Sequence, residues 1–586
     1  MKRVVLGMLL LFAVAMVSAM PAYRGWMMYE QADGSTIELR MVGDEYCHFL
    51  MNHDGEQVRL NEAGMYEAIG AIPTEEVFAA RHAASKKARQ SLSPRKADIG
   101  FGVTPNPAPK GVVILVNFSD KAMASGHTQA VFDELCNSEN CTVNGDYPSA
   151  AEYFEAQSGG QYRPQFDVFG PVTLSGTVAH YGKNKYFSSM GESFDQLPAD
   201  AVVEGCLLAD SIYDINFADY DSNGDGLVDF VYVIYAGRGE ADGGESNTIW
   251  PHNWDVYSAI EYGLCTYPWE QCELDGVMLS NYAMSNELVS NGWWGTSTTL
   301  CGIGTLCHEF GHVIGLPDFY DTAYGTNYSN SLTPNDWDVM DGGGYNGSGH
   351  CPPNYSPWEK YFFGWTTPTN IGNDTLSVSL YPNGTEEYNP YQLNSTGVQQ
   401  APAEEGICYY LESRKQSGWD DYIPASGMVI WKVQYDTVAW MNNEPNNTAN
   451  HPLYTIVCSS GTRIGSYYGS NNVFPNGTKK SWTGVTGRPV IHITKGTNGV
   501  ITFDYQPKKH AVHWKAEGGE VATEFFAHGE PLRLPEIDHP ECGEKEFIGW
   551  TQHGEWADPF IDPEDLFAEP KDIYVTEEQI FNALFQ

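Results

Sequence analysis

The stretch HEFGHVIGLPDFYD, residues 308–321, constrains the fold more than any other part of the chain. The residues before it, IGTLC, are apolar and suit a helix. Gly315, followed two residues later by a proline, predicts that this helix ends in the left-handed conformation and cannot resume. On such a helix His308 and His312 share one face, about 6 Å apart along the axis. The chain must then turn back and carry Asp318 toward that face.

Two histidines at this spacing, with Glu309 beside the first, form the pattern H-E-x-x-H. In this pattern both imidazoles bind one Zn²⁺ and the glutamate reaches a metal-bound water. A third protein ligand is needed, and a carboxylate oxygen is acceptable. Asp318 stands where the longer pattern H-E-x-x-H-x-x-G-x-x-H has its last histidine. No glutamate lies between Glu309 and Glu359, so Glu359 and Asp321 are the alternatives, and we favour Asp318.

Two residues downstream of the motif are candidates for supporting roles. Met340 stands in WDVMDGGGY, and a methionine in a tight turn beneath the metal marks the metzincin proteases. The alternative is an ordinary core methionine before a glycine loop. Tyr345, which ends this stretch, is a candidate transition-state stabiliser by position alone.

A second metal motif lies in DYDSNGDGLVDF. Oxygen-bearing side chains recur at alternate positions of a glycine-kinked loop, a pattern that wraps Ca²⁺. A full EF-hand would have glutamate at the twelfth position, where this chain has phenylalanine, so a shorter calcium loop is predicted. The alternative is a simple acidic turn. The predicted calcium ligands are Asp221, Asn223, Asp225 and Asp229.

The amino-terminal residues predict export. Met1-Lys2-Arg3 precede an apolar run that ends in small residues, so residues 1–19 are expected to be a signal peptide. No later stretch is apolar for long enough to predict a membrane span. Net charge is −43, from 75 acidic against 32 basic residues, which excludes nucleic acid as an expected partner.

An exported chain with 12 cysteines can form disulfides. Two pairs are close enough in sequence to be local bridges, and we predict both as disulfide candidates. They are Cys136 with Cys141 and Cys265 with Cys272.

Shifts in composition divide the chain further. Residues 20–80 alternate like short strands and turns, and 81–109 form a linker that starts with a basic island, RHAASKKARQSLSPRK, open to proteolytic cleavage. Residues 110–368 mix strands and helices, 369–507 predict a β-sandwich, and 508–586 form a small β-rich unit. The predicted class is therefore multidomain α+β.

Three elements of the largest domain can be predicted individually. The apolar runs GVVILVNFSD, residues 111–120, and VDFVYVIYAG, residues 228–237, predict buried strands. PSAAEYFEAQSGGQY, residues 148–162, predicts a helix that Ser149 caps and Gly159 ends.

Taken in order, several stretches resemble the immune inhibitor A family of secreted bacterial zinc metallopeptidases, which are metzincin-like. These are VVILVNFSD, AAEYFEAQSGGQY, DSNGDGLVDFVYVIYAGRGE, IWPHNW, GIGTLCHEFGHVIGLPDFYD, WDVMDGGGY and GMVIWKVQYD. The resemblance covers about residues 20–506. It implies a propeptide, a zinc endopeptidase domain and a β-sandwich, with His308, His312 and Asp318 at the zinc positions and Glu309 as catalytic acid/base.

The last 79 residues are similar to the small β-grasp-like repeat of internalins, through VHWKAEGGEV, FIGWT and IFNALFQ. That likeness implies an adhesion or spacing module, for which a host or cell-surface ligand is a candidate partner.

The sequence thus predicts a secreted zinc endopeptidase that acts on proteins or peptides and is made as a zymogen. Cys47, in the expected propeptide, is a weak candidate for a thiolate that blocks the metal, because its surroundings read as a buried strand. The alternative function is a surface adhesin on an inactive protease scaffold, and the carboxy-terminal β modules favour it.

Overall fold

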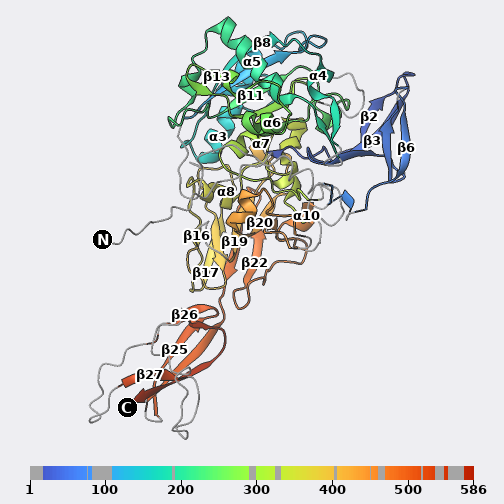
Figure 1. The fold of residues 1–586 in the computed structure, drawn as a ribbon. Helices are drawn as coiled ribbons and strands as arrows, with labels where there is room; N and C mark the ends of the chain where they lie inside the picture. The colour runs from blue at the N-terminus through green and yellow to red at the C-terminus, as the bar shows by residue number, and fades with distance from the viewer. Residues whose placement is uncertain are drawn as a thin grey trace, which may run out of the picture.

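The structure is a computed structural model. It describes residues 18–61, 63–74, 77–78, 80–81, 108–187, 192–289, 299–323, 332–400, 406–448, 451–459, 469–516, 519–532, 534, 547–551 and 573–585. Most of the predicted signal peptide and nearly all of the predicted linker lie outside these residues. Figure 1 shows a blue amino-terminal sheet beside a green and cyan α/β part, with an orange β part below it and a red unit at the carboxyl end.

A five-stranded antiparallel sheet forms the amino-terminal part. Its strands follow one another in space as in sequence, which suits short connections with turn residues such as Gly55 and Gly64, both at positive φ. The strands are β2 (Met27–Glu30), β3 (Thr36–Gly43), β4 (His48–Met51), β5 (Glu56–Leu60) and β6 (Tyr66–Ala71).

A six-stranded sheet with the order β1-β12-β15-β11-β7-β8 lies at the centre of the α/β part. The four strands from β15 to β8 are parallel, whereas β12 runs antiparallel to β15 and β1 runs antiparallel to β12. The bounds are β1 (Ser18–Ala19), β7 (Lys110–Asn117), β8 (Gln165–Thr173), β11 (Val231–Tyr235), β12 (His252–Asp255) and β15 (Asn281–Asn286).

Both faces of this sheet are covered, which explains the continuous apolar runs of its central strands. Val113 and Tyr232 point into one core cluster, and Val112 and Val233 point into the other. The two strands predicted from apolar runs are confirmed as β7 and β11.

Helices pack on each face. On one lie α2 (Gln129–Asn137), α3 (Ala150–Ser158) and α7 (Gly304–Val313), and on the other α5 (Pro198–Tyr213) and α6 (Val256–Glu261). The helix predicted within residues 148–162 is confirmed as α3: Ser149 accepts a hydrogen bond from the N–H of Glu152, and Gly159 ends the helix at φ 63°. The shorter elements here are α4 (Val178–Gly182), β9 (Asn184–Phe187), β10 (Glu192–Asp195), β13 (Glu273–Leu274) and β14 (Val277–Met278).

The next part contains two sheets with an apolar core between them. Five strands form one sheet: β16 (Thr369–Asn370), β18 (Tyr391–Asn394), β19 (Ile407–Arg414), β20 (Gly427–Gln434) and β21 (Tyr454–Ile456). Three form the other: β17 (Leu376–Leu380), β23 (Ile501–Tyr505) and β22 (Val490–Lys495). Three short helices lie before or beside them, α8 (Pro357–Phe362), α9 (Thr437–Met441) and α10 (Gly469–Asn472).

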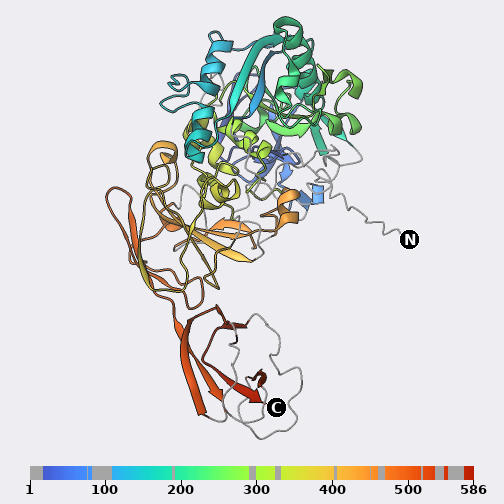
Figure 2. The same ribbon diagram turned by 90° about the vertical axis from the view of Figure 1, so that its left-hand side faces the viewer.

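The two-sheet part and the α/β part share one hydrophobic core. Trp431 of β20 and Tyr454 of β21 belong to the same buried cluster as Trp358 of α8 and Phe310 of α7. Burying such large side chains stabilises an interface by about 1.5–3 kcal/mol each. The two-sheet part is therefore packed against the rest of the protein as a domain core is, and Figure 2 shows it directly below the α/β part.

The carboxy-terminal unit consists of strands around Trp514, Trp550 and Phe581. Four strands form one sheet in the order β25-β24-β29-β27, in which β24 and β29 are parallel, and two short strands form another. The bounds are β24 (Lys509–Ala516), β25 (Gly519–Ala527), β26 (Glu530–Leu532), β27 (Phe547–Thr551), β28 (Ile573–Val575) and β29 (Gln579–Phe585).

The predicted mixed α+β class is confirmed, whereas neither predicted disulfide is formed. The cysteines of both pairs are free thiols in the structure. Cys136 is buried in the core beside Phe132, and the thiol of Cys272 donates to the carbonyl of Pro268 instead. No helix in the described ranges has both the length and the apolar character needed to cross a bilayer.

Candidate metal centre

Helix α7 carries the H-E-x-x-H motif, and its end follows the sequence prediction. Gly315 takes a left-handed φ of 108°, and its N–H donates to the carbonyl of His312. The turn then brings the carbonyl of Leu316 to Nδ1 of His312, at 2.8 Å. The same short stretch therefore ends the helix and orients one of its histidines.

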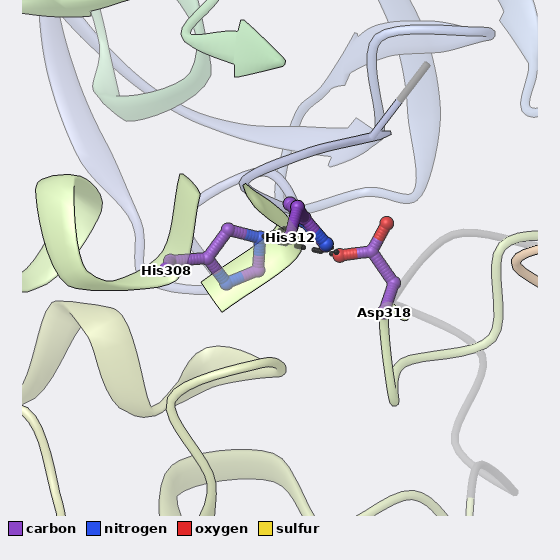
Figure 3. Close-up of side chains that lie close together, drawn as sticks. All are labelled: His308, His312 and Asp318. Atoms are coloured by element: carbon purple, nitrogen blue, oxygen red, sulfur yellow. Dashed lines mark hydrogen bonds and ion pairs between the residues drawn. The ribbon is translucent and has the colours of Figure 1, made fainter. Parts of the chain in front are cut away.

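Three side-chain atoms converge next to this helix (Figure 3). Nε2 of His308 and Nε2 of His312 are 3.2 Å apart, and Oδ1 of Asp318 lies 3.2 Å and 3.3 Å from them. A tetrahedral site with bonds of about 2.0–2.1 Å has edges of roughly 3.3–3.4 Å. The spacing of the three atoms therefore fits zinc.

The orientation of the histidines also fits a metal. Nδ1 of His308 lies 2.7 Å from the carbonyl of Val339, and the corresponding atom of His312 faces Leu316. A carbonyl can only accept, so each Nδ1 carries the proton and each Nε2 presents a lone pair. Three lone-pair atoms that meet at this distance inside the protein repel one another unless a cation lies between them. In the described part of the chain, no other histidine, cysteine or acid side chains form such a group.

Electrostatics keeps the aspartate ionised. Asp318 is fully buried, which on its own would raise the pKa of its carboxyl group. When the site holds no metal and Nε2 of His312 and His308 carries a proton, attraction to these rings and their hydrogen bonds outweigh burial and hold that pKa well below the usual range. A bound cation at the same place would act in the same direction. The ligand position therefore keeps its negative charge at any ordinary pH.

Glu309 lies beside these three residues and is also fully buried. Burial raises the pKa of its carboxyl group to about 8, and the attraction to His308 offsets only part of that rise. Oε1 accepts a hydrogen bond from the backbone N–H of Met20 at 3.1 Å, whereas Oε2 has no hydrogen-bond partner among the described residues. A buried carboxyl group with a pKa near neutrality is suited to accept and return a proton.

The N–H of Met20 belongs to an extended segment that crosses α7. Ser18 and Ala19 form β1, the edge strand of the central sheet, and pair antiparallel with Asn253 and His252 of β12. Beyond them, Met20 is completely buried.

Side chains of the α/β part hold this cleft segment, residues 18–24. The carbonyl of Met20 accepts from Nε1 of Trp250 at 3.1 Å, and that of Pro21 accepts from the hydroxyl of Tyr345 at 2.7 Å. Arg24 forms an ion pair with Asp341 at 2.5 Å. No feature of the sequence MPAYR signals these contacts, which join residues more than 200 positions apart.

The turn around Met340 lies against the other side of α7. A Cβ atom at Gly311 would lie 2.4 Å from Sδ of Met340, so the absence of a side chain at Gly311 lets the methionine pack under the helix. The carbonyl of Met340 accepts from the N–H of Phe319, next to Asp318, and that of Val339 faces His308. The turn thus supports ligands on both sides of the site.

The alternative third ligands lie outside this group. Glu359 is buried in the capping box of α8, where Oε2 accepts from the N–H of Ser356 at 2.6 Å. Asp321 accepts from the N–H of Ala323 in the following turn. Cys47, the candidate for a blocking thiolate, packs beside Phe49 and Phe78 in a separate core, and Met20 is the residue that reaches Glu309.

In the predicted calcium loop, the acidic side chains bind the loop's own backbone. Oδ1 of Asp221 accepts from the N–H groups of Gly224 and Asp225, and its Oδ2 accepts from Gly226. Asp229 accepts from the N–H of Ser222. The aspartates of this loop do not converge as the three residues at α7 do.

Comparisons with known proteins relate the chain to peptidases. A sequence profile described as "Immune inhibitor A peptidase M6, catalytic domain" matches residues 108–370. Immune inhibitor A of Bacillus thuringiensis subsp. alesti is 33% identical over 299 residues, which are 45% of this chain and 41% of that protein. The pre-pro-metalloprotease PrtV of Vibrio cholerae serotype O1 is 28% identical over 291 residues, or 43% of this chain and 29% of that protein.

The chain therefore spans less than half the length of either of these relatives. The residues that the profile matches contain α7, Asp318 and the turn at Met340. Residues 108–370 are thus similar to the catalytic domain of the immune inhibitor A family of M6 peptidases.

Proposed function

We propose that the chain is a secreted zinc endopeptidase that hydrolyses proteins or peptides and is made as a zymogen. The observation that carries this proposal is the convergence of His308, His312 and Asp318 at about 3.2 Å beside the buried Glu309. The names of the relatives, an immune inhibitor and a pre-pro-metalloprotease, support it.

In this proposal the three converging side chains hold Zn²⁺, which when bound polarises the scissile carbonyl and acidifies a water. Glu309 takes the proton of the attacking water and returns it to the leaving amine. The contact of its Oε1 with the N–H of Met20 supports the second role, because a peptide nitrogen already lies within reach. Tyr345, which donates to the carbonyl of Pro21, is the proposed donor to a substrate carbonyl.

The proposed zymogen rests on the cleft segment. Its residues 20–24 bury Met20 beside Glu309, contact Tyr345 through the carbonyl of Pro21 and pair Arg24 with Asp341, so a substrate cannot bind while they are in place. If the signal peptide is removed after Ala19, the nitrogen of Met20 becomes an amino group that faces the carboxylate of Glu309. Cleavage in the linker 81–109 is the proposed step that lets residues 20–80 leave.

The remaining parts keep the roles that the sequence predicts. Residues 369–507 are proposed as a β-sandwich domain and 508–586 as a module for adhesion or spacing. A structural Ca²⁺ in the loop of Asp221, Asn223, Asp225 and Asp229 is proposed on its residue spacing.

The function is tested on the secreted chain after limited proteolysis of the linker. Casein should be cleaved, and a zinc chelator should abolish the cleavage. Glu309→Ala should retain zinc and lose activity. Chelator-insensitive cleavage, or no cleavage once the linker is cut, would contradict the proposal. Binding to a host protein or glycan by a chain without turnover would support the adhesin instead.

A further inference from the structure

The loop that carries Asp318 is held by a segment from the two-sheet part of the chain. This clamp segment, residues 443–447, follows α9 and contributes three asparagine side chains to the loop. Asn446 donates to the carbonyl of Phe319 at 2.7 Å, and Asn447 accepts from the N–H of Thr322 at 2.9 Å. The third, Asn443, contacts Asp318 itself.

Asn443 and Asp318 exchange two hydrogen bonds. Nδ2 of Asn443 donates to Oδ2 of Asp318 at 2.6 Å, and the backbone N–H of Asp318 donates to Oδ1 of Asn443, also at 2.6 Å. The side chains are buried, with 3% and 0% of their residues' surface exposed. One amide group therefore binds both the carboxylate and the backbone of the same residue, which leaves the carboxylate little freedom to rotate.

The bond from Asn443 determines which carboxylate oxygen faces the metal site. Oδ2 is held by the amide, and this leaves Oδ1 directed at Nε2 of His308 and His312. We propose that Asn443, from outside the peptidase domain, is a positioning residue that orients Asp318 as a single-oxygen metal ligand. This inference rests on the proposed function, because it takes Asp318 as the third ligand.

The conformation of Asn443 suits this role. Its φ is 56°, in the left-handed region that asparagine adopts more readily than other residues with a Cβ. Its own carbonyl accepts from Oγ1 of Thr322 at 2.8 Å, so the backbone is also anchored to the metal-site loop. A short amide side chain on a left-handed backbone is thereby brought to Asp318 from a distance of 125 positions in sequence.

A residue that only holds the two parts of the chain together should not affect the metal site when it is replaced. The clamp segment contains such a residue, Asn447, for comparison with Asn443. Asn447 also binds a loop residue twice, since it accepts from the N–H of Thr322 and donates to its Oγ1 at 2.9 Å. In the described part of the chain its side chain forms hydrogen bonds with Thr322 and none with His308, His312 or Asp318. Loss of the Asn447 amide should weaken the interface alone, whereas loss of the Asn443 amide should change the metal site.

The experiment compares three substitutions in the full chain: Asn443→Gly, Asn443→Asp and Asn447→Ala. Asn443→Gly removes the amide and tolerates the positive φ, so it adds no backbone strain. Asn443→Asp keeps the size and the acceptor but loses the donor at neutral pH. Zinc affinity is measured by competition with a chelator, and the geometry of the site by the visible absorption spectrum of the Co²⁺-loaded protein.

Loss of an outer partner of a metal ligand typically weakens metal binding by about 10–100-fold. Asn443→Gly should weaken zinc binding by that factor and change the Co²⁺ spectrum. Asn443→Asp should change the spectrum as well, and it carries the test if the glycine variant does not fold. Asn447→Ala should leave affinity and spectrum close to those of the parent, even if it lowers thermal stability.

Two results would overturn the inference while leaving the proposed function intact. One is unchanged zinc affinity and an unchanged Co²⁺ spectrum in the Asn443 variants. The other is an equal effect of Asn447→Ala, which would reduce Asn443 to a docking contact. Failure of the proposed function gives a different result: the parent chain itself would bind no zinc, and His308→Ala would make no difference.

Discussion

The two metal motifs of this chain contrast in how far their ligands are arranged without an ion. At α7, His308, His312 and Asp318 are buried, and partners from other loops orient His308 and Asp318. In the loop that starts at Asp221, the side chains are partly exposed and their oxygens bind the loop's own N–H groups. In both motifs the spacing of the side chains in sequence suits a metal ion. Only at α7 are these side chains buried and hydrogen-bonded to residues outside the motif. These two features preorganise a site.

The largest expected effect comes from removing a ligand of the buried site. His308→Ala should abolish zinc binding and peptidase activity, because two ligands do not hold the metal in competition with water and buffer. Zinc content of the purified protein and casein cleavage measure this. His451→Ala, at an exposed histidine, is the matched control. If the His308→Ala protein keeps its zinc, the buried residues at α7 are not the metal site, and the two motifs no longer differ in this respect.

Glu309→Gln should separate chemistry from metal binding. The amide cannot accept the proton of the water, so kcat should fall by roughly 10²–10⁴-fold. Zinc content should remain that of the parent, because Glu309 is not one of the three converging residues. Equal loss of zinc and activity would mean that the carboxylate holds the ion rather than the proton.

The amino-terminal part covers the site at α7. A histidine of this part, His48, pairs with an acidic residue of the α/β part. His48 of β4 lies 3.4 Å from Glu240, with Asp195 nearby and the ring of Trp250 stacked on it. Burial alone would lower the pKa of His48, but Glu240 and the backbone carbonyl of Asp44, which accepts a hydrogen bond from Nδ1, raise it to about 9. Because this pKa is above the ordinary value, the pairing stabilises the cover fully below about pH 6.5 and is lost as pH rises through 9.

Raising the pH from 7 to 9.5 should therefore speed the extraction of zinc from the uncleaved chain, by roughly tenfold, which corresponds to about 1.4 kcal/mol of lost docking free energy. The rate is followed with a coloured chelator. His48→Gln should already be fast at pH 7 and should lose most of the pH dependence. His53→Gln, whose partner Glu38 lies in the same amino-terminal sheet, should behave as the parent. Equal rates for all three proteins would exclude His48 from the cover.

The smallest expected effect belongs to the exposed loop. If it binds Ca²⁺, a concentration ten times the Kd should stabilise the fold by about 1.4 kcal/mol. In a domain of about 150–250 residues that raises Tm by roughly 3–6 °C. Asp225→Asn should remove the rise, and His308→Ala should retain it. If Ca²⁺ does not change Tm, the loop is an acidic turn that binds no calcium.

The parts of the fold that were predicted correctly depend on neighbouring residues. The capping of α3 by Ser149, the end of α7 at Gly315 and the buried strands β7 and β11 each follow from a stretch of about ten residues. Hydrophobic periodicity, caps and glycine conformations act within that range. The same is true of the placement of His308 and His312 on one face of a helix.

The predicted disulfides failed because proximity in sequence is not enough to form a bond. Cys136 is near Cys141 along the chain, but its side chain faces the core while the other lies past the end of the helix. A disulfide also needs side chains that point toward each other, which spacing does not specify.

By itself, the sequence determined the motif helix, its termination and the kinds of side chain that could hold a metal. Only the tertiary structure decided that Met20 lies against Glu309 and that Asn443 holds Asp318, since these contacts join residues 289 and 125 positions apart. The physical reason is that helix geometry is set by local backbone preferences, whereas long-range partners are selected by how whole elements pack. In this protein the H-E-x-x-H motif is local, and the residues that orient or cover it come from the rest of the chain.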